Sequence, residues 1–247
     1  MNFYTLFLIL FFTSCSHSNS ALVHIPEASG ICYAKNTNSL FVANDEGSVF
    51  EISTDGKILR KKRLGKYDLE GVTCDNNKGK LYFSVEGSDN ILIVNQKTLV
   101  VQKEVDIKRT FKKVTVLKKD KKNGIEGITS TPKGIYISNQ STKKWPKDDP
   151  SVVIKIDTVK KKKTAIKEII NHGFKDVAGL SFHNGYLYMV SDSENLLIKY
   201  DLKNRKTVST KKLQDFAQEG IAFDDNGYIY FADDNGKVLK YKSKGFL

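Results

Sequence analysis

The chain has 247 residues, of which 40% are hydrophobic and 11% aromatic, enough apolar material for one packed domain. Its low proline content (4) and moderate glycine content (17) exclude low-complexity and collagen-like classes. The net charge of +12 invites a nucleic-acid interpretation, but the lysines lie in short runs (112–113, 118–122 and 160–163) between strand patterns, where solvated charge is expected. We therefore expect no nucleic-acid partner.

The N-terminus predicts export. Residues 3–12 form an unbroken apolar run that is too short to span a bilayer as a helix but has the length of a signal-peptide core. Small residues then precede Cys15, as in the lipobox of bacterial lipoproteins, where the cysteine receives a diacylglycerol. Phe12 and the lack of Lys or Arg before the run depart from that pattern, so an ordinary cleaved signal with an incidental cysteine stays open.

We favour a lipoprotein of the bacterial cell envelope that is anchored to a membrane and faces the periplasm; a soluble periplasmic protein is the alternative. This divides the chain into a signal peptide (1–15), a short tether (16–20) and a single domain (21–247).

Five copies of one short motif organise that domain. In each copy an acidic or small residue precedes a glycine that is followed by an aliphatic residue. The intervals between the glycines are 41, 56, 52 and 41 residues, and the glycines are Gly30, Gly71, Gly127, Gly179 and Gly220. Each is followed by an aromatic-rich strand pattern, a turn of Gly, Asn and acidic residues, and a further strand pattern. Short strands also suit sandwiches and barrels, but a repeat of this length favours an all-β, five-bladed β-propeller of four-stranded antiparallel blades.

The fifth repeat has three strand patterns and lacks an outer one, whereas residues 21–25 form an unused strand pattern at the other end of the domain. We expect 21–25 to pair with 237–241 as the outer strand of the last blade, because a ring that is closed by hydrogen bonds leaves no loose blade.

Two cysteines lie inside the repeats, Cys32 and Cys74, both in apolar strand patterns. They stand at different offsets from their local glycines and so do not occupy equivalent positions. We expect two buried free thiols; a disulfide in an oxidising compartment is the alternative that the sequence does not decide.

The repeats resemble those of the SdiA-regulated family, distant relatives of proteins with NHL repeats. The resemblance runs from about Glu27 to the end and depends on the Glu-x-Ser-Gly opening at Glu27, the Ala-Gly-Leu of the fourth repeat, and the Glu-Gly pairs at Glu70, Glu126 and Glu219. It implies a five-bladed propeller with a bound calcium ion and no established reaction.

The repeats themselves also predict a cation site. In a propeller the first strand of each blade lines the central channel, so residues before the repeated glycines form a ring. Glu70, Glu126 and Glu219 occupy three of these positions, and Asp176 and Glu27 lie two residues from the other two. Converging carboxylates repel one another unless some are protonated or a cation binds, and calcium accepts about six to eight oxygen ligands in flexible geometry. We expect one calcium ion in the channel; the alternative is that these side chains accept hydrogen bonds from backbone amides of neighbouring blades and bind nothing.

Three functions follow from these features. A calcium-binding envelope module that binds a partner or a small molecule with its faces ranks first, a metal-dependent ester or phosphoester hydrolase second, and a scaffold without an ion third. Hydrolysis needs an acid or base beside the ion, and His172 is the candidate, although no catalytic residue is assigned. Trp145, in the loop 141–150, is either an exposed anchor for a ligand or partner, or packed against the blade edge.

Overall fold

The computed structural model describes residues 21–120, 124–157, 159, 161–214 and 216–247. The predicted signal peptide, Cys15 and the tether lie outside the described residues. Among those described, no helix is long and apolar enough to cross a membrane.

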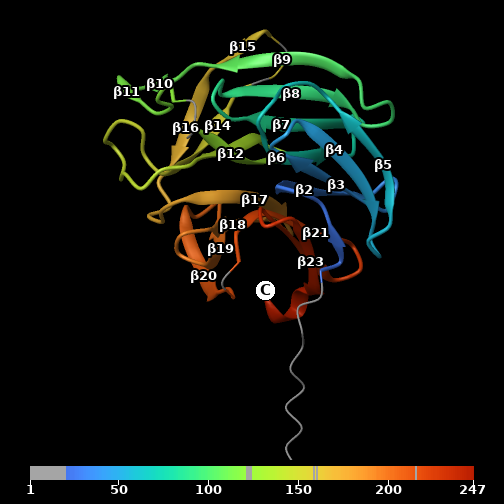
Figure 1. The fold of residues 1–247 in the computed structure, drawn as a ribbon. Helices are drawn as coiled ribbons and strands as arrows, with labels where there is room; N and C mark the ends of the chain where they lie inside the picture. Colours follow the sequence, from blue (N-terminus) through green and yellow to red (C-terminus); the bar gives the residue numbers. More distant parts are fainter. Residues whose placement is uncertain (1–20, 121–123, 158, 160, 215) are drawn as a thin grey trace, which may run out of the picture.

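The described chain forms five antiparallel sheets around one axis, as the repeats predict (Figure 1). Blade 1 is β2 (Ala28–Ala34), β3 (Ser39–Asn44), β4 (Ser48–Ser53) and β5 (Ile58–Arg63). Blade 2 is β6 (Leu69–Asp75), β7 (Lys80–Val85), β8 (Asn90–Asn95) and β9 (Val101–Ile107). Blade 3 is β12 (Ile125–Thr131), β13 (Gly134–Asn139), β14 (Val152–Ile156) and β16 (Ile166–Ile170). Blade 4 is β17 (Val177–His183), β18 (Tyr186–Ser191), β19 (Leu196–Asp201) and β20 (Lys206–Lys212). Blade 5 is β21 (Gln218–Phe223), β22 (Tyr228–Asp233), β23 (Lys237–Lys242) and β1 (Val23–His24).

The remaining elements are short. β10 (Thr110–Phe111) and β11 (Val114–Thr115) form a hairpin between blades 2 and 3, β15 (Lys163–Thr164) joins β9 in parallel, and a 3-10 turn, η1, covers Ser243–Gly245.

The predicted closure of the ring is confirmed. β1 pairs with β23, so that Val23 lies opposite Val238. The Leu22 amide also donates to the Val238 carbonyl (2.7 Å) and the Ile25 amide to the Gly236 carbonyl (3.1 Å). An apolar cluster then joins blade 5 to blade 1, with Tyr230 on one side and Leu40 on the other. Four further clusters fill the other gaps between adjacent blades, which is the packing of a continuous ring.

The repeated glycines are needed because the innermost strands approach one another closely at the axis. A Cβ on Gly30 would lie 2.5 Å from the carbonyl oxygen of Glu70 in the next blade, and one on Gly71 would lie 2.6 Å from that of Glu126. The contact recurs around the ring and returns to its start, where Gly220 meets the Ser29 carbonyl at 2.9 Å. The motif found in the sequence therefore marks the point of closest approach between blades.

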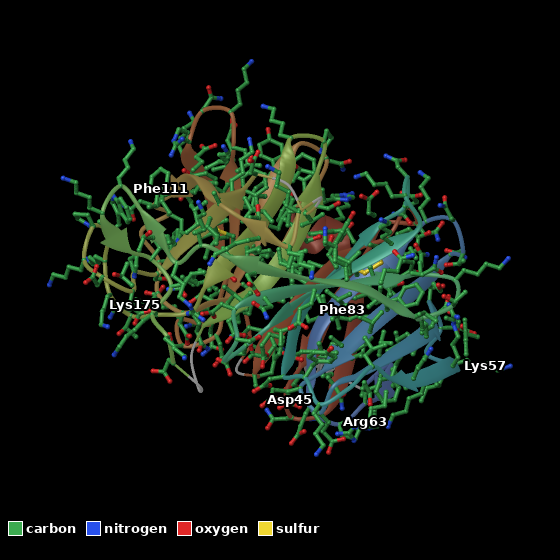
Figure 2. All side chains as sticks on the ribbon, turned by 90° about the horizontal axis from the view of Figure 1, so that it is seen from above. Asp45, Lys57, Arg63, Phe83, Phe111 and Lys175 are labelled. Atoms are coloured by element: carbon green, nitrogen blue, oxygen red, sulfur yellow. A yellow bond between two sulfur atoms is a disulfide. The ribbon has the colours of Figure 1, made fainter. Side chains whose placement is uncertain are left out.

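The prediction of two free thiols is wrong, because Cys32 on β2 and Cys74 on β6 form a disulfide (yellow in Figure 2). Successive side chains along a strand alternate in direction. The Cβ direction of Gly30 points at blade 2, so Cys32, two residues on, points there too. Gly71 points at blade 3, so Cys74, three residues on, points back toward blade 1. The unequal offsets are thus what allows the two sulfur atoms to meet.

Candidate metal centre

The antiparallel meander brings ten carboxylates to one mouth of the central channel. Residues that begin each first strand lie beside residues that end the second strand of the same blade: Ala28 opposes Asn44, Leu69 opposes Val85, and Gln218 opposes Asp233. The acids at or next to these positions are here called the acidic mouth: Glu27, Asp45, Asp68, Glu70, Glu86, Glu126, Asp176, Asp192, Glu219 and Asp234. A chain with a net charge of +12 therefore concentrates negative charge at one end of its axis.

Glu126, Glu70 and Glu219, the three predicted ring glutamates, lie close enough to affect one another. Glu126 is 4% exposed, and burial raises its pKa well above the usual range, with further increases from the charges of Glu70, Glu219 and Glu86. Burial likewise raises the pKa of Glu70 well above its usual range, aided by Asp68 and Glu86. The pKa of Glu219 rises to about 8, first through burial and then through acidic neighbours that include Asp192 and Asp176.

The tightest group lies at the start of blade 2. Carboxylate oxygens of Asp68, Glu70 and Glu86 are all within 4.8 Å of one another. Burial, followed by the charge of Asp68, raises the pKa of Glu86 to about 7. These three side chains combine one residue of the predicted ring with two that the sequence analysis did not assign to the site.

Glu27 lies at the entry to blade 1, the blade that packs against blade 2. Burial and then a hydrogen bond with Glu27 raise the pKa of Asp45 to about 7. Glu27 also raises the pKa of Asp234, after burial. The five residues predicted as ligands thus all belong to the acidic mouth; Glu27 acts on the outer acids Asp45 and Asp234, whereas Asp176 acts on Glu219.

The alternative in which the ring glutamates are held by backbone amides does not fit the hydrogen bonding. Among the described residues, no backbone amide donates to the side chains of Glu70, Glu126 or Glu219. Glu219 Oε2 and Asp45 Oδ1 are buried without any hydrogen-bond partner in the described part of the chain. Buried anionic oxygens without a donor are costly unless a cation or a proton neutralises them, so the donor set fits a hard divalent cation.

His172 does not serve this centre as an acid or base. It is 6% exposed, its Nδ1 accepts a hydrogen bond from the Phe174 amide (3.2 Å), and burial alone lowers its pKa to about 4. No carboxylate of the acidic mouth contributes to that shift. His183 ends β17 at the other end of the channel, where it stacks on Phe223 with ring centroids 4.4 Å apart.

Trp145 is half-buried and packs against the apolar cluster between blades 2 and 3, which supports the packed alternative for this side chain. Its ring centroid lies 6.4 Å from that of Phe111 on the β10–β11 hairpin. The Asp149 amide donates to the Thr115 carbonyl (2.7 Å), so the two segments that lengthen the 56- and 52-residue intervals support each other. Both rings line an open groove of about 460 Å³ on the side of blade 3, well away from the axis.

The channel is narrow between its two mouths. At the level of the five glycines it narrows to a space of about 10 Å³. Beyond this constriction the opposite mouth holds a polar cavity of about 240 Å³ whose lining includes the Cys32–Cys74 disulfide.

Fold and site together define a five-bladed propeller with an acidic axial centre. The chain belongs to the SdiA-regulated family, whose model matches residues 20–235. No curated protein sequence matches it.

Two solved structures share the fold. Over 87% of this chain and 90% of the other, the glutaminyl cyclase of Myxococcus xanthus superposes with a TM-score of 0.67 and 12% identity. The hydrazine synthase of Kuenenia stuttgartiensis superposes with a TM-score of 0.51 and 16% identity over 90% of this chain, which spans 58% of that chain. At these identities the similarity is one of fold alone.

Proposed function

We propose that this protein is an exported, lipid-anchored, calcium-binding propeller that acts as a binding module of the bacterial cell envelope. The observation that carries the proposal is the acidic mouth, where three buried or half-buried glutamates from three blades meet and Glu219 Oε2 lies buried without a hydrogen-bond partner. Glu70, Glu126 and Glu219 would hold the ion, with Asp68 and Glu86 beside Glu70, and Asp176 and Glu27 completing the outer shell.

Calcium fits this donor set better than the other common divalent cations. All the donors are carboxylate oxygens, and they come from several blades. Calcium tolerates irregular geometry and bidentate carboxylates, whereas magnesium needs a near-ideal octahedron. A soft-metal site would require sulfur or imidazole donors, and both cysteines of the described chain are joined in a disulfide at the other end of the channel.

The disulfide supports export. Disulfides persist in oxidising compartments such as the periplasm and are rare in the cytosol. The Cys32–Cys74 bond thus agrees with the compartment that the apolar run at 3–12 predicts, through an independent feature of the chain.

The hydrolase alternative gains no specific support. The glutaminyl cyclase is an enzyme by name, but 12% identity carries the fold and not the reaction. Of the histidines in the described chain, His172 is buried away from the acids, His183 lies at the far end of the channel, and His24 is on the outer strand β1. We therefore rank binding above catalysis.

Titration calorimetry with calcium tests the ion site. Wild type should bind one equivalent, and Glu126→Gln, which keeps the shape and removes the charge, should bind much more weakly. An exposed acid on the same face supplies the matched control, because Glu46→Gln should leave binding unchanged. Absence of calcium binding by wild type contradicts the proposal.

Phase partitioning in Triton X-114 tests the anchor separately. The full chain expressed in a Gram-negative host should enter the detergent phase, and Cys15→Ser should move it to the aqueous phase. Equal partitioning of the two proteins would mean that Cys15 is not acylated, and it would leave the calcium site untouched.

A further inference from the structure

Exposed apolar side chains gather on the face opposite the acidic mouth. Each blade turns back twice at that face, between its first and second and between its third and fourth strands. Ile58 (45% exposed) and Leu59 (51%) directly follow the turn between the third and fourth strands of blade 1. Val100 (51%) follows the equivalent turn of blade 2, and Val208 (47%) lies near the start of β20 in blade 4. These are four of the five large hydrophobic residues that are exposed in the described chain.

Lysines accompany these apolar residues. Lys57 and Lys97 are exposed in the same two turns, and Lys203 is exposed in the equivalent turn of blade 4. We call the set Lys57, Ile58, Leu59, Lys97, Val100 and Val208 the basic apolar rim. Lys57 and Asp45, both labelled in Figure 2, mark the two ends of blade 1.

The parts of the rim on blades 1 and 2 form one surface because Arg60 ties them together. Its Nε pairs with Glu51 (2.5 Å), while its terminal nitrogens donate to the carbonyls of Lys97 and Gln96. The guanidinium group of Arg60 is therefore occupied by contacts within the protein, and it holds the Lys97 turn beside Leu59. Lys57 and Lys97 are the cations of the rim that are not held in this way, and the exposed carboxylate of Asp55, in the same turn as Lys57, offsets part of their charge.

The N-terminal segment enters the domain beside this rim. The carbonyl of Leu22 packs on Gly56, which lies in the same turn as Lys57. A Cβ added to Gly56 would lie 2.3 Å from the Leu22 carbonyl oxygen. Lys240 also donates to the Thr54 carbonyl of that turn (2.6 Å), which fixes blade 5 and the entering chain against blade 1. Only five residues, 16–20, lie between Ala21 and Cys15, the predicted lipid-bearing residue.

We propose that the basic apolar rim rests on an anionic bilayer, with its lysines among the headgroups and its apolar side chains at the acyl boundary. Alternating cationic and apolar side chains are the combination that interfacial segments present to such a surface. The acidic mouth, at the other end of the axis, then points away from the negatively charged lipid and into the aqueous phase. The inference deepens the proposed function, since it rests on the membrane anchor and adds an orientation.

Two physical terms favour this orientation over its reverse. A tether this short keeps the domain within tens of ångströms of the bilayer, and surface charges are felt over a screening length of about 8 Å at physiological ionic strength. Lipid phosphates would attract the lysines of the rim and repel those acids of the mouth that are ionised. The calcium centre would thus stay open to an envelope partner.

Depth-dependent fluorescence quenching on the full chain tests the proposal. Trp145 is the single tryptophan, so Trp145→Phe gives a background without tryptophan into which one reporter is placed. Leu59→Trp reports the rim, and Lys66→Trp, an exposed position in the connection to the second blade at the acidic end, is the matched control. Each protein is reconstituted into phosphatidylglycerol vesicles with and without brominated acyl chains, and co-flotation is measured in the same samples.

We expect the rim reporter to lose intensity to the brominated lipid and to shift to shorter wavelength, and the control reporter to do neither. The quenching should weaken in phosphatidylcholine vesicles, in high salt and in Lys57→Glu/Lys97→Glu, because each removes the attraction to phosphate.

Co-flotation without quenching at Leu59→Trp overturns the orientation while leaving the anchor intact. Equal quenching of both reporters overturns it as well. If Cys15→Ser fails to change partitioning yet the rim reporter is still quenched, the anchor is wrong and the rim proposal stands.

Discussion

Replacing Glu126 by glutamine should change stability in opposite directions with and without calcium. Without a cation, Glu126 must fold as a buried carboxyl whose pKa is raised well above its usual range by burial and by Glu70, Glu219 and Glu86. A raised carboxyl pKa stabilises the fold only at low pH, and this contribution is lost as the pH rises through the folded-state value. Glutamine avoids that cost, so at pH 8 in chelator Glu126→Gln should melt above wild type.

With calcium the order should reverse. An ion at a free concentration about a hundredfold above its dissociation constant stabilises the folded state by about 2.7 kcal/mol. For a domain of this size, each kcal/mol moves the melting temperature by about 2–4 °C, so wild type should gain on the order of 5–11 °C. Glu126→Gln should gain much less because it lacks the most buried donor of the ring.

Differential scanning calorimetry at pH 8, on both proteins with calcium and with chelator, measures all four melting temperatures. Glu46→Gln, an exposed acid on the same face, should behave as wild type in both conditions. If Glu126→Gln melts below wild type in chelator as well, Glu126 is held by interactions that glutamine cannot make. The reasoning from carboxylate repulsion would then be wrong.

Three further predictions concern the ring itself. Gly127→Ala should lower the free energy of unfolding by about 1–3 kcal/mol in chemical denaturation, because its Cβ would lie 2.6 Å from a backbone oxygen of the next blade. Gly245→Ala, whose Cβ would have nothing within 4 Å, should leave it unchanged. Replacing Cys32 and Cys74 by serine should cost about 4 kcal/mol, since the bond closes a loop of 42 residues; a melting curve that does not change would contradict this. His172, whose pKa is lowered from 6.5 to about 4, stabilises the fold fully above pH 6.5, and about 2 kcal/mol should be lost between pH 7 and 5 in wild type but not in His172→Phe.

The fold was predictable because its signal recurs. One glycine per blade is required wherever two innermost strands meet, so the same constraint appears five times at the spacing of a blade. The closing strand was predictable by counting, since the fifth repeat lacks one strand and 21–25 supplies it. The regular strand itself covers only Val23–His24. Backbone hydrogen bonds of Leu22 and Ile25 continue the pairing beyond it on both sides.

Four of the ten acids of the mouth were missed because another explanation accounts for them. Asp45, Glu86, Asp192 and Asp234 each follow a second strand, where turn chemistry alone accounts for a polar residue. Their common position, directly opposite the start of the first strand, shows only when the register between the two strands is known. Comparing turn positions across blades, as the glycines were compared, reveals the ring, because four of five equivalent positions are acidic and the fifth is Gln140.

The disulfide was missed for a related reason. The sequence analysis expected a disulfide only between cysteines at equivalent positions of two repeats. Neighbouring blades are related by a rotation about the axis. Two side chains that meet between them therefore point in opposite directions relative to their own strands. Cys32 and Cys74 therefore need offsets from their glycines that differ by an odd number, and theirs differ by one.

A meander of short strands also separates functions along its axis without any domain boundary. Connections between the second and third strands, and between blades, all lie at one end, whereas the other two sets of turns lie at the other end. Residues in the turns at either end can be substituted without altering the core, since the strands between the turns provide the packing. Acids accumulate at the first end and lysines with exposed apolar residues at the second. Because the chain enters beside the second end, an anchor at Cys15 would present the cation centre outward, and reversing these two charge patterns should reverse the face that meets the lipid.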